Sequence, residues 1–499
     1  MPVITLKSSV RRLGVWIVGM SSICLVAQTE PVVDEDVPTF SEHIAPIVFR
    51  NCAACHRAGE AAPFPLTNYR EVKKRGKMMA RVVESRFMPP WHAESQNYAF
   101  LDERRLSDQQ IGLIRQWVDA GMPEGNPEQL PEFPTFVTGW QLGEPDLVVR
   151  MGEAYSLHAE GADIYRNFVL PLNLTEDKWV QAIEFRPGSR SIVHHSLFFY
   201  DTTGQAREQD AEDPEPGFKR MGLGTRRNSS LGGWAVGGVP RKLPDGLAIR
   251  LPKDADLILS THFHPSGKEE KEISTVGFYF ADKPPEEDFT AVQLPSVFGA
   301  LAGIEIPANE EHYVKQDHFV LPVDAKAFSV SAHAHYLGKS MQMTATLPDG
   351  AVQQLLNISS WDFSWQEEYR YQDYIFLPKG TRLDAEIVWD NSVDNVNNPH
   401  HPPQPVKWGR ESTDEMGCVT LQVVAADRSE FSQLNKAIRR HVRMAATESF
   451  VNRSSGSQRR RNRTSFIKRM VDRFDTDGDG KLSQAERNAA RKTFRGNRP

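Results

Sequence analysis

Phe328-Ser-Val-Ser-Ala-His-Ala-His335 is the stretch from which the fold is most easily inferred. Phenylalanine, valine or alanine occupies its even positions, and serine or histidine occupies its odd ones. Because successive side chains of a β-strand point to opposite faces, this alternation predicts a half-buried strand. His333 and His335 then project side by side from the polar face.

Similar runs recur on both sides of this stretch, from about residue 140 to residue 430. Alternating or β-branched segments occupy residues 147–151, 179–185, 191–200, 257–264, 342–347 and 383–389. Turn sequences such as Pro187-Gly188 and Pro348-Asp349-Gly350 separate them. Short strands divided by turns are typical of antiparallel β-sandwiches. The length of the region predicts two sandwiches in tandem, over residues 140–305 and 306–435.

Histidines gather on these predicted strands. Three clusters are present: His194-His195, His262-Phe-His264 and His333-Ala-His335. The two imidazoles of each His-x-His face the same way and can chelate one ion. Adjacent His194 and His195 point to opposite faces in a regular strand, so sharing an ion requires a bulge or a strand end. A single strand histidine is usually structural, but three clusters among fifteen histidines favour metal binding.

Four segments then occur in an informative order. They are Val193-His194-His195, Leu-Ser-Thr-His262-Phe, Ala332-His-Ala-His-Tyr-Leu-Gly-Lys339 and Asp414-Glu415-Met416. Together they resemble the copper type II, ascorbate-dependent monooxygenases, which include peptidylglycine α-hydroxylating monooxygenase and dopamine β-monooxygenase. The resemblance spans most of residues 145–430. It implies an oxidoreductase that hydroxylates a C–H bond of a small molecule with O2, on two copper ions.

The resemblance also implies which residues hold each copper. An electron-transfer copper would take His194, His195 and His262, and an oxygen-binding, catalytic copper would take His333, His335 and Met416. His264 has no counterpart in this scheme. Three imidazoles suit copper, zinc or nickel alike, whereas an added thioether selects soft Cu(I) over zinc. Without the motif, Met416 alone would be interpreted as a core residue.

Two positions at which this sequence departs from the family limit which substrates can be expected. Ser331 stands where the peptidylglycine enzymes have an arginine that grips the peptide carboxylate, and Thr420 stands where they have a substrate-binding tyrosine. A peptide C-terminus is therefore not the expected substrate. The family's disulfides are also missing, because Cys418 is alone in this region.

An N-terminal segment, residues 38–125, resembles small all-α cytochrome c domains. It contains Cys52-Ala-Ala-Cys55-His56, the spacing that attaches haem c through two thioethers and one axial imidazole. A redox Cys-x-x-Cys and half a zinc site are the alternatives, but no second ligand pair and no βαβ surround are evident. Met88 is the favoured sixth ligand. Met78, Met79 and His92 are its rivals.

Helix signals support this interpretation. Ser107-Asp-Gln-Gln110 is a capping-box pattern, after which Ile111, Ile114 and Trp117 share one face. Residues 69–86 also have helical character. Both helices suit an all-α domain.

The C-terminal end contains a calcium-binding pattern. Residues 450–466 are predicted to form a basic linker, and residues 467–495 an EF-hand. The calcium ligands would be Asp475, Asp477, Asp479, Lys481 through its carbonyl, Ser483 and Glu486, with Gly480 at the turn. A single hand favours a role in stability or docking over switching.

The N-terminus has the features of an export signal. Lys7, Arg11 and Arg12 precede an apolar run that is short for a membrane span, so residues 1–27 are predicted to be a cleaved signal peptide, with an uncleaved anchor as the alternative. The sequence therefore predicts a periplasmic or secreted protein that has no further membrane span. The net charge of −6 over 499 residues predicts no nucleic-acid partner. Four cysteines are too few for a disulfide-stapled protein.

The sequence thus predicts a multi-domain enzyme with haem c, two copper ions and Ca²⁺. We hypothesise that the haem domain, or another reductant or donor protein, supplies electrons to the coppers. The alternatives are a non-catalytic haem and copper protein for electron transfer or copper handling, and an interaction protein that has lost turnover.

Overall fold

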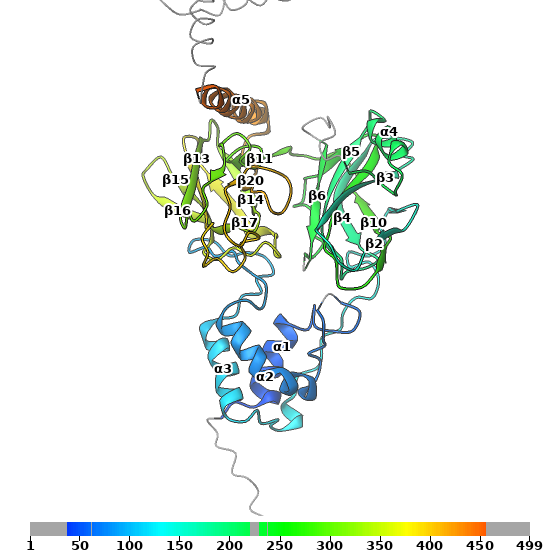
Figure 1. Cartoon of the computed structure of the whole chain (residues 1–499), viewed down its shortest axis with the longest axis vertical. Coiled ribbons are helices and arrows are strands. Elements are labelled where there is room, and N and C mark those ends of the chain that lie inside the picture. The colour runs from blue at the N-terminus through cyan, green and yellow to red at the C-terminus, as the bar shows by residue number, and fades with distance from the viewer. Residues whose placement is uncertain (1–36, 61, 220–228, 237, 456–499) are drawn as a thin grey trace, which may run out of the picture.

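The computed structural model describes residues 37–60, 62–219, 229–236 and 238–455 (Figure 1). Two antiparallel β-sandwiches lie side by side, and a helical region lies across one end of both. The tandem sandwiches predicted from the alternating runs are therefore confirmed. The predicted signal peptide, residues 1–27, and the predicted EF-hand, residues 467–495, lie outside the described residues.

The helical region is built from short helices around an aromatic core. Its elements are η1 (Phe40–Ile44), α1 (Ala45–Asn51), α2 (Tyr69–Glu84), α3 (Asp108–Asp119) and η2 (Pro127–Gln129). The capping box is present, because the Ser107 side chain accepts from the Gln110 N–H and the Gln110 side chain accepts from the Ser107 N–H. Trp117 and Ile114 from α3 are fully buried beside Phe40. Both predicted helices are confirmed.

The segment between α2 and α3 leaves this region and joins the second sandwich. Trp91 and Phe100 are buried in the core of that sandwich, not in the helical core. Glu94 bridges to Asn357, and Phe100 bridges to Tyr371. The unit predicted over residues 38–125 is thus not self-contained, because aromatic side chains of this segment are buried against β-strands.

In the part of the first sandwich that the structure describes, there are ten strands and one helix. They are β1 (Leu147–Arg150), β2 (Tyr155–Leu157), β3 (Ile164–Pro171), β4 (Lys178–Arg186), β5 (Val193–Asp201), α4 (Gln205–Glu212), β6 (Ser230–Ala235), β7 (Ile249–Leu251), β8 (Asp256–Phe263), β9 (Glu270–Glu272) and β10 (Thr275–Phe280). The two main sheets have the orders β1-β10-β4-β7 and β3-β8-β5-β6, and β2 pairs with β9. Every residue of β8, the strand that ends in His262 and Phe263, is buried, and β8 is one of the two inner strands of its sheet.

The second sandwich also contains ten strands. They are β11 (Phe289–Leu294), β12 (Glu305–Ile306), β13 (Tyr313–Val320), β14 (Ala325–Ala334), β15 (Gly338–Thr346), β16 (Val352–Ile358), β17 (Glu368–Leu377), β18 (Arg382–Trp389), β19 (Val406–Lys407) and β20 (Gly417–Ala425). The main sheets have the orders β11-β20-β14-β17 and β13-β18-β15-β16. Because β11 pairs with β20, the second sandwich begins with β11 at Phe289, and the boundary predicted between residues 305 and 306 is wrong.

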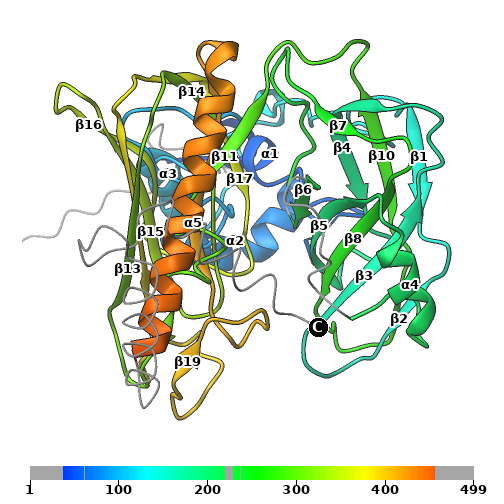
Figure 2. The same cartoon turned by 90° about the horizontal axis from the view of Figure 1, so that it is seen from above.

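Helix α5 (Phe431–Ser455) follows the last strand and lies along the second sandwich (Figure 2). Leu434 is fully buried, and the His441 imidazole bonds to Asp317 of β13 at 3.0 Å. The linker predicted over residues 450–466 therefore starts inside a helix, and only its later part lies beyond the described residues. No described helix is both long and apolar enough to cross a membrane.

Candidate metal centres

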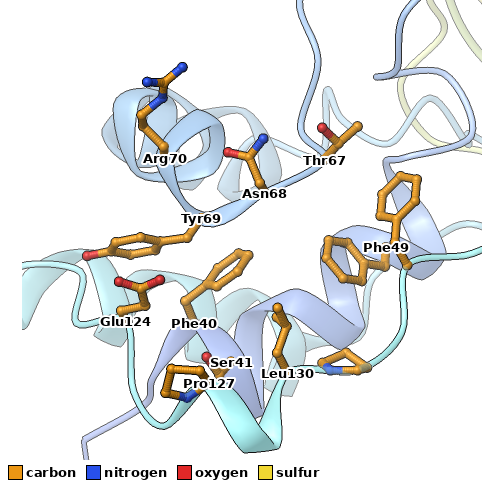
Figure 3. Close-up of a pocket in the computed structure, with 12 residues that line it drawn as sticks. Phe40, Ser41, Phe49, Thr67, Asn68, Tyr69, Arg70, Glu124, Pro127 and Leu130 are labelled. Carbon is orange, nitrogen blue, oxygen red and sulfur yellow. The ribbon is translucent and has the colours of Figure 1, made fainter.

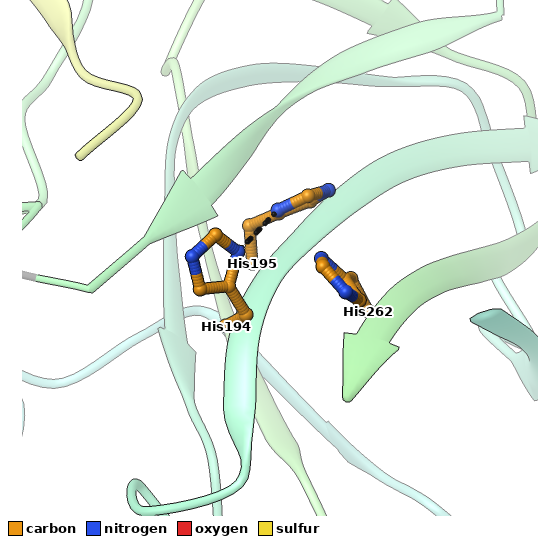
Figure 4. A group of neighbouring side chains, drawn as sticks. All are labelled: His194, His195 and His262. Carbon is orange, nitrogen blue, oxygen red and sulfur yellow. Dashed lines mark hydrogen bonds between the residues drawn. The ribbon is translucent and has the colours of Figure 1, made fainter. Parts of the chain in front are cut away.

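The first histidine cluster forms where β5 begins and β8 ends. The ligand nitrogens of His194, His195 and His262 all lie within 4.8 Å of one another (Figure 4). A register shift between Val193 and His195 breaks the regular alternation of β5 against β8. That irregularity lets two adjacent imidazoles approach one point, as the sequence required.

The Nδ1 atoms of His194 and His195 are hydrogen-bonded to each other, so the unpaired buried nitrogen of this cluster is His262 Nδ1. His194 Nδ1 and His195 Nδ1 are 3.1 Å apart. His262 Nε2 lies 2.8 Å from a carboxylate oxygen of Asp163, whereas His262 Nδ1 is buried without a hydrogen-bond partner. A carboxylate only accepts, so His262 carries its proton on Nε2 and directs a lone pair from Nδ1. An orphaned buried lone pair beside two further imidazoles fits a bound metal ion.

Burial keeps His194 and His195 in the neutral form that binds metals. It lowers the pKa of His194 to about 3, with a further contribution from His262. Burial and the neighbouring imidazoles lower the pKa of His195 well below its ordinary value. Burial alone would raise the pKa of Asp163, but hydrogen bonds from His262, His264 and Ser412 bring it below the usual range. The site thus combines neutral ligands with one anion behind them.

Asp163 also explains His264. Its second oxygen lies 2.8 Å from His264 Nδ1, and the His264 side chain is 63% exposed. His264 therefore lies outside the three-nitrogen cluster and braces the aspartate. Tyr165, opposite His262 in the β3–β8 pairing, stacks on its ring at 4.2 Å and 10°. Asp163 and Tyr165 could not be predicted from the sequence, because a long-range strand pairing brings them here.

The second cluster lies at the matching edge of the other sandwich. His333 is in β14 and His335 follows it, with ring centroids 5.3 Å apart. β14 pairs with β20 through His333↔Cys418 and Ala334↔Gly417. The ladder ends there, so His335 directly follows β14 and Met416 directly precedes β20. Ligation by Met416 stays a prediction.

Hydrogen bonds leave the Nε2 atoms of this cluster free. His335 Nδ1 donates to the Asp414 carbonyl at 3.0 Å. The Gln366 amide nitrogen donates to the Phe363 carbonyl at 3.0 Å, which turns its oxygen toward His333 Nδ1 at 2.6 Å. Both Nδ1 atoms therefore carry protons, and both Nε2 lone pairs are available to a metal. Burial lowers the pKa values of His333 and His335 to about 4 and about 3.

The Glu415 side chain accepts hydrogen bonds from the backbone at both His335 and Met416. One carboxylate oxygen accepts from the Leu337 N–H at 2.6 Å. The other accepts from the N–H groups of His335 and Met416, both at 3.1 Å, and from Trp389 Nε1 at 2.9 Å. Burial raises the pKa of Glu415 to about 8, and these donors oppose the rise. The Glu415 side chain thus holds the backbone of both expected ligands through its two oxygens.

Phe363 lies between the two clusters. Its ring stacks on His194 at 5.2 Å and lies 5.7 Å from His335. The imidazoles of His333 and His335 also contribute to the lowered pKa of His195, so the clusters face each other across the space between the sandwiches. Phe363 belongs to the loop between β16 and β17. Its signal in the sequence was the aromatic run Trp361-Asp-Phe-Ser-Trp365.

The Cys-x-x-Cys-His motif forms a tight turn after α1. The N–H groups of Cys55 and His56 both donate to the Cys52 carbonyl, at 3.2 and 2.9 Å. Neither cysteine of the motif is in a disulfide. His56 Nδ1 bonds to the Phe64 carbonyl at 3.0 Å, which leaves Nε2 free. Two thiols on one turn beside an oriented imidazole fit thioether-attached haem.

The candidates for the sixth haem ligand are distributed differently. Met79 is 6% exposed within the helical core, as a structural methionine would be, and Met78 is half-buried in the same helix. Met88 is half-buried in the loop after α2, where its N–H donates to the Val82 carbonyl. His92 bonds to the Ser360 backbone at the second sandwich, and its buried Nε2 has no hydrogen-bond partner. Ligation by Met88 stays a prediction.

Ion pairs join the helical region to both sandwiches. Glu60, four residues after His56, pairs with Arg190, four residues before His194, at 2.8 Å. Arg104 pairs with Glu367 at 2.5 Å. Burial raises the pKa of Cys55, and charges of all four residues also act on it. Cys55 therefore faces the junction of the three parts.

A cavity of about 390 Å³ lies elsewhere in the helical region (Figure 3). The rings of Phe40, Phe49 and Tyr69 contribute to its walls. Cys52, Cys55 and His56 are not among its lining residues, so it is separate from the haem motif.

The predicted calcium ligands and the predicted copper ligands differ in whether the structure describes them. The calcium ligands Asp475, Asp477, Asp479, Lys481, Ser483 and Glu486 lie outside the described residues. All three predicted ligands of the first copper are brought together, and the two histidines of the second are adjacent.

Comparisons with known proteins add little to this geometry. No family model matches the chain, and no curated protein matches it. A capsid structure of infectious bursal disease virus Gx strain shares 9% identity at a TM-score of 0.18, over 56% of this chain and 73% of that one. PNGF-II shares 10% identity at 0.25, over 56% of this chain and 65% of that one. The cowpea mosaic virus top component shares 8% sequence identity at a TM-score of 0.25, over 54% of this chain and 92% of that one. Similarities this weak leave the site itself as the basis for inference.

Proposed function

We propose that this protein is a copper-dependent monooxygenase that hydroxylates a C–H bond of a small molecule with O2. The observation that carries the proposal is the convergence of His194, His195 and His262, with the orphaned Nδ1 of His262 directed into the cluster. The facing pair His333 and His335 supplies a second set of free imidazole nitrogens.

Copper explains the donor set better than zinc does. Each cluster offers neutral nitrogens, and the carboxylates of Asp163 and Glu415 bond to ligands or their backbone. A site with two imidazoles and the Met416 thioether selects Cu(I). A bound copper pair would supply O2 activation and single-electron transfer.

The protein's own residues would orient and insulate the site. Gln366 and the Asp414 carbonyl set the tautomers of His333 and His335, Glu415 fixes the backbone at His335 and Met416, and Phe363 limits water between the clusters. Such supporting contacts fix ring orientation and raise ligand basicity.

The helical region is proposed to bind haem c through Cys52, Cys55 and His56, and to act as the electron donor. The support is proximity, because the Glu60–Arg190 ion pair joins the haem motif to the segment that precedes His194. Export to a periplasmic or extracellular space, and calcium binding near the C-terminus, remain parts of this proposal.

Copper titration combined with oxygen uptake tests the function. We expect two copper ions and one haem per chain, and O2 consumption that requires a reductant. His262→Ala should lose one copper, whereas His264→Ala should retain both. Tight copper binding with no oxygen uptake would favour the alternative, a non-catalytic protein for electron transfer or copper handling.

A further inference from the structure

Two consecutive apolar residues are held in an unusual conformation beside the second cluster. Val297 and Phe298 have φ values of +57° and +52°. Their side chains remain 41% and 39% exposed. A β-branched residue rarely adopts positive φ, and such outliers persist only where the surroundings enforce them.

Three hydrogen bonds enforce this conformation. The Phe298 N–H donates to the Gln293 side-chain oxygen at 3.0 Å. The Phe298 carbonyl accepts from the Gly417 N–H at 3.1 Å and from Trp408 Nε1 at 3.0 Å. Gly417 is the residue after Met416, so the loop is fastened directly to the expected metal site.

The strained loop places an aromatic ring on a metal ligand. Phe298 meets the His333 imidazole edge-on, with centroids 5.3 Å apart and planes at 83°. Its backbone is fully engaged while its ring stays partly open to solvent. A fold that needed only to bury this ring would turn it inward, so the exposure points to a ligand.

The polar residues on the same face of the sheet are mostly uncharged. Thr420 of β20 stands opposite Ser331 of β14 and Gln293 of β11, and the Gln293 amide donates to its hydroxyl at 3.3 Å. Glu368 of β17, the charged member of this row, also stands opposite Ser331 and accepts from Gln422. The row offers no cation to a substrate carboxylate.

We propose that Val297 and Phe298 form the apolar wall of the substrate site beside His333, and that the substrate is a molecule with an aromatic or alkyl portion and no carboxylate. This inference rests on the proposed function, and it names the substrate class of the same site.

Binding of three matched probes to the metal-free protein tests it. Benzyl alcohol, benzoate and benzylamine at pH 7 have the same ring and carry no charge, a negative charge and a positive charge. Measured by ligand-observed NMR titration, benzyl alcohol and benzylamine should each bind at least about tenfold more tightly than benzoate. Equal or tighter binding of benzoate, or no binding of any probe, would overturn the inference.

Variants of Phe298 test whether the probes bind at this apolar wall. Phe298→Ala should weaken benzyl alcohol at least about tenfold. The control Phe376→Ala, an exposed ring paired with Lys326 at the far end of β14, should leave affinity unchanged. Phe298→Leu keeps an apolar side chain and should retain most of the affinity, which guards against misfolding of the alanine variant. If Phe298→Ala binds benzyl alcohol with unchanged affinity, the proposed apolar wall is refuted.

Copper stoichiometry separates this inference from the proposed function. A protein that binds benzyl alcohol through Phe298 but takes up no copper would keep the apolar wall and lose the oxygenase. If the protein binds two coppers but not benzyl alcohol, the apolar wall is refuted and the oxygenase proposal stands.

Discussion

Single side chains decide which nitrogen each imidazole offers to a metal. Asp163 holds the proton of His262 on Nε2, and Gln366 holds that of His333 on Nδ1. These partners could not be inferred from the sequence, because Asp163 reaches His262 through the β3–β8 pairing and Gln366 reaches His333 from a loop. The ligand histidines themselves could be predicted, since their clustering is local.

Replacing Asp163 should weaken the first metal site. Asp163→Asn removes the anion behind His262 and can leave its proton on the wrong nitrogen, so copper affinity at this site should fall by about 10- to 100-fold. Isothermal titration with copper measures the change. Asp177→Asn, at an exposed aspartate paired with Arg250, is the control. Unaltered affinity in Asp163→Asn would show that the aspartate does not orient His262.

Replacing Glu415 should loosen the second site selectively. In Glu415→Gln the amide nitrogen cannot accept, so at least one buried N–H loses its partner, at a cost of about 2–3 kcal/mol. Chemical denaturation should show that loss, and copper titration should show a weakened second site beside an intact first one. Glu286→Gln, on the surface, should change neither. Equal weakening of both sites would contradict a local role.

At the scale of elements, strand pairing converts local patterns into sites. Each alternating run predicted from the sequence overlaps an observed strand, namely β1, β4, β5, β8, β14, β15 and β18. The bulge at His194 was a stated requirement, and the register shift supplies it. The pairing of β11 with β20 was not predictable, because nothing local to residues 289–294 specifies a partner so distant in sequence.

Docking of α5 should depend on pH. The Asp317 hydrogen bond raises the pKa of His441 above its usual 6.5. The protonated form therefore stabilises docking at pH values below 6.5, and this contribution, under about 1 kcal/mol, is lost as the pH rises through the raised folded-state value. Hydrogen exchange of α5 amides, corrected for intrinsic rates, should be faster at pH 8.5 than at pH 6. His441→Gln should remove the difference, and a persistent difference would assign it elsewhere.

At the scale of the whole molecule, the helical region docks where the two sandwiches meet. Trp91 and Phe100 anchor it in the second sandwich, and the Glu60–Arg190 pair links it to the first. The sequence indicated the modules but not their junction, because the interface residues carry no motif. This docking links the segment that follows the Cys-x-x-Cys-His motif to the segment that precedes the first histidine cluster.

Disrupting that junction should slow electron delivery without changing the metal sites. Arg190→Glu places two like charges together in place of the Glu60 pair. Stopped-flow oxidation of the reduced haem by the copper-loaded protein should slow several-fold. Arg115→Glu, within the helical region beside Glu84, is the matched charge change away from the junction. If both variants transfer electrons at the wild-type rate, the junction is not the path.

The central claim is that this chain holds two copper ions in chemically different sites. X-ray absorption of the anaerobic Cu(I) protein, with its copper content measured, tests it most directly. The account predicts two ions per chain and a sulfur scatterer that disappears in Met416→Leu, while the His194, His195 and His262 site keeps its nitrogens. One ion or none, or no sulfur in the unaltered protein, would contradict it.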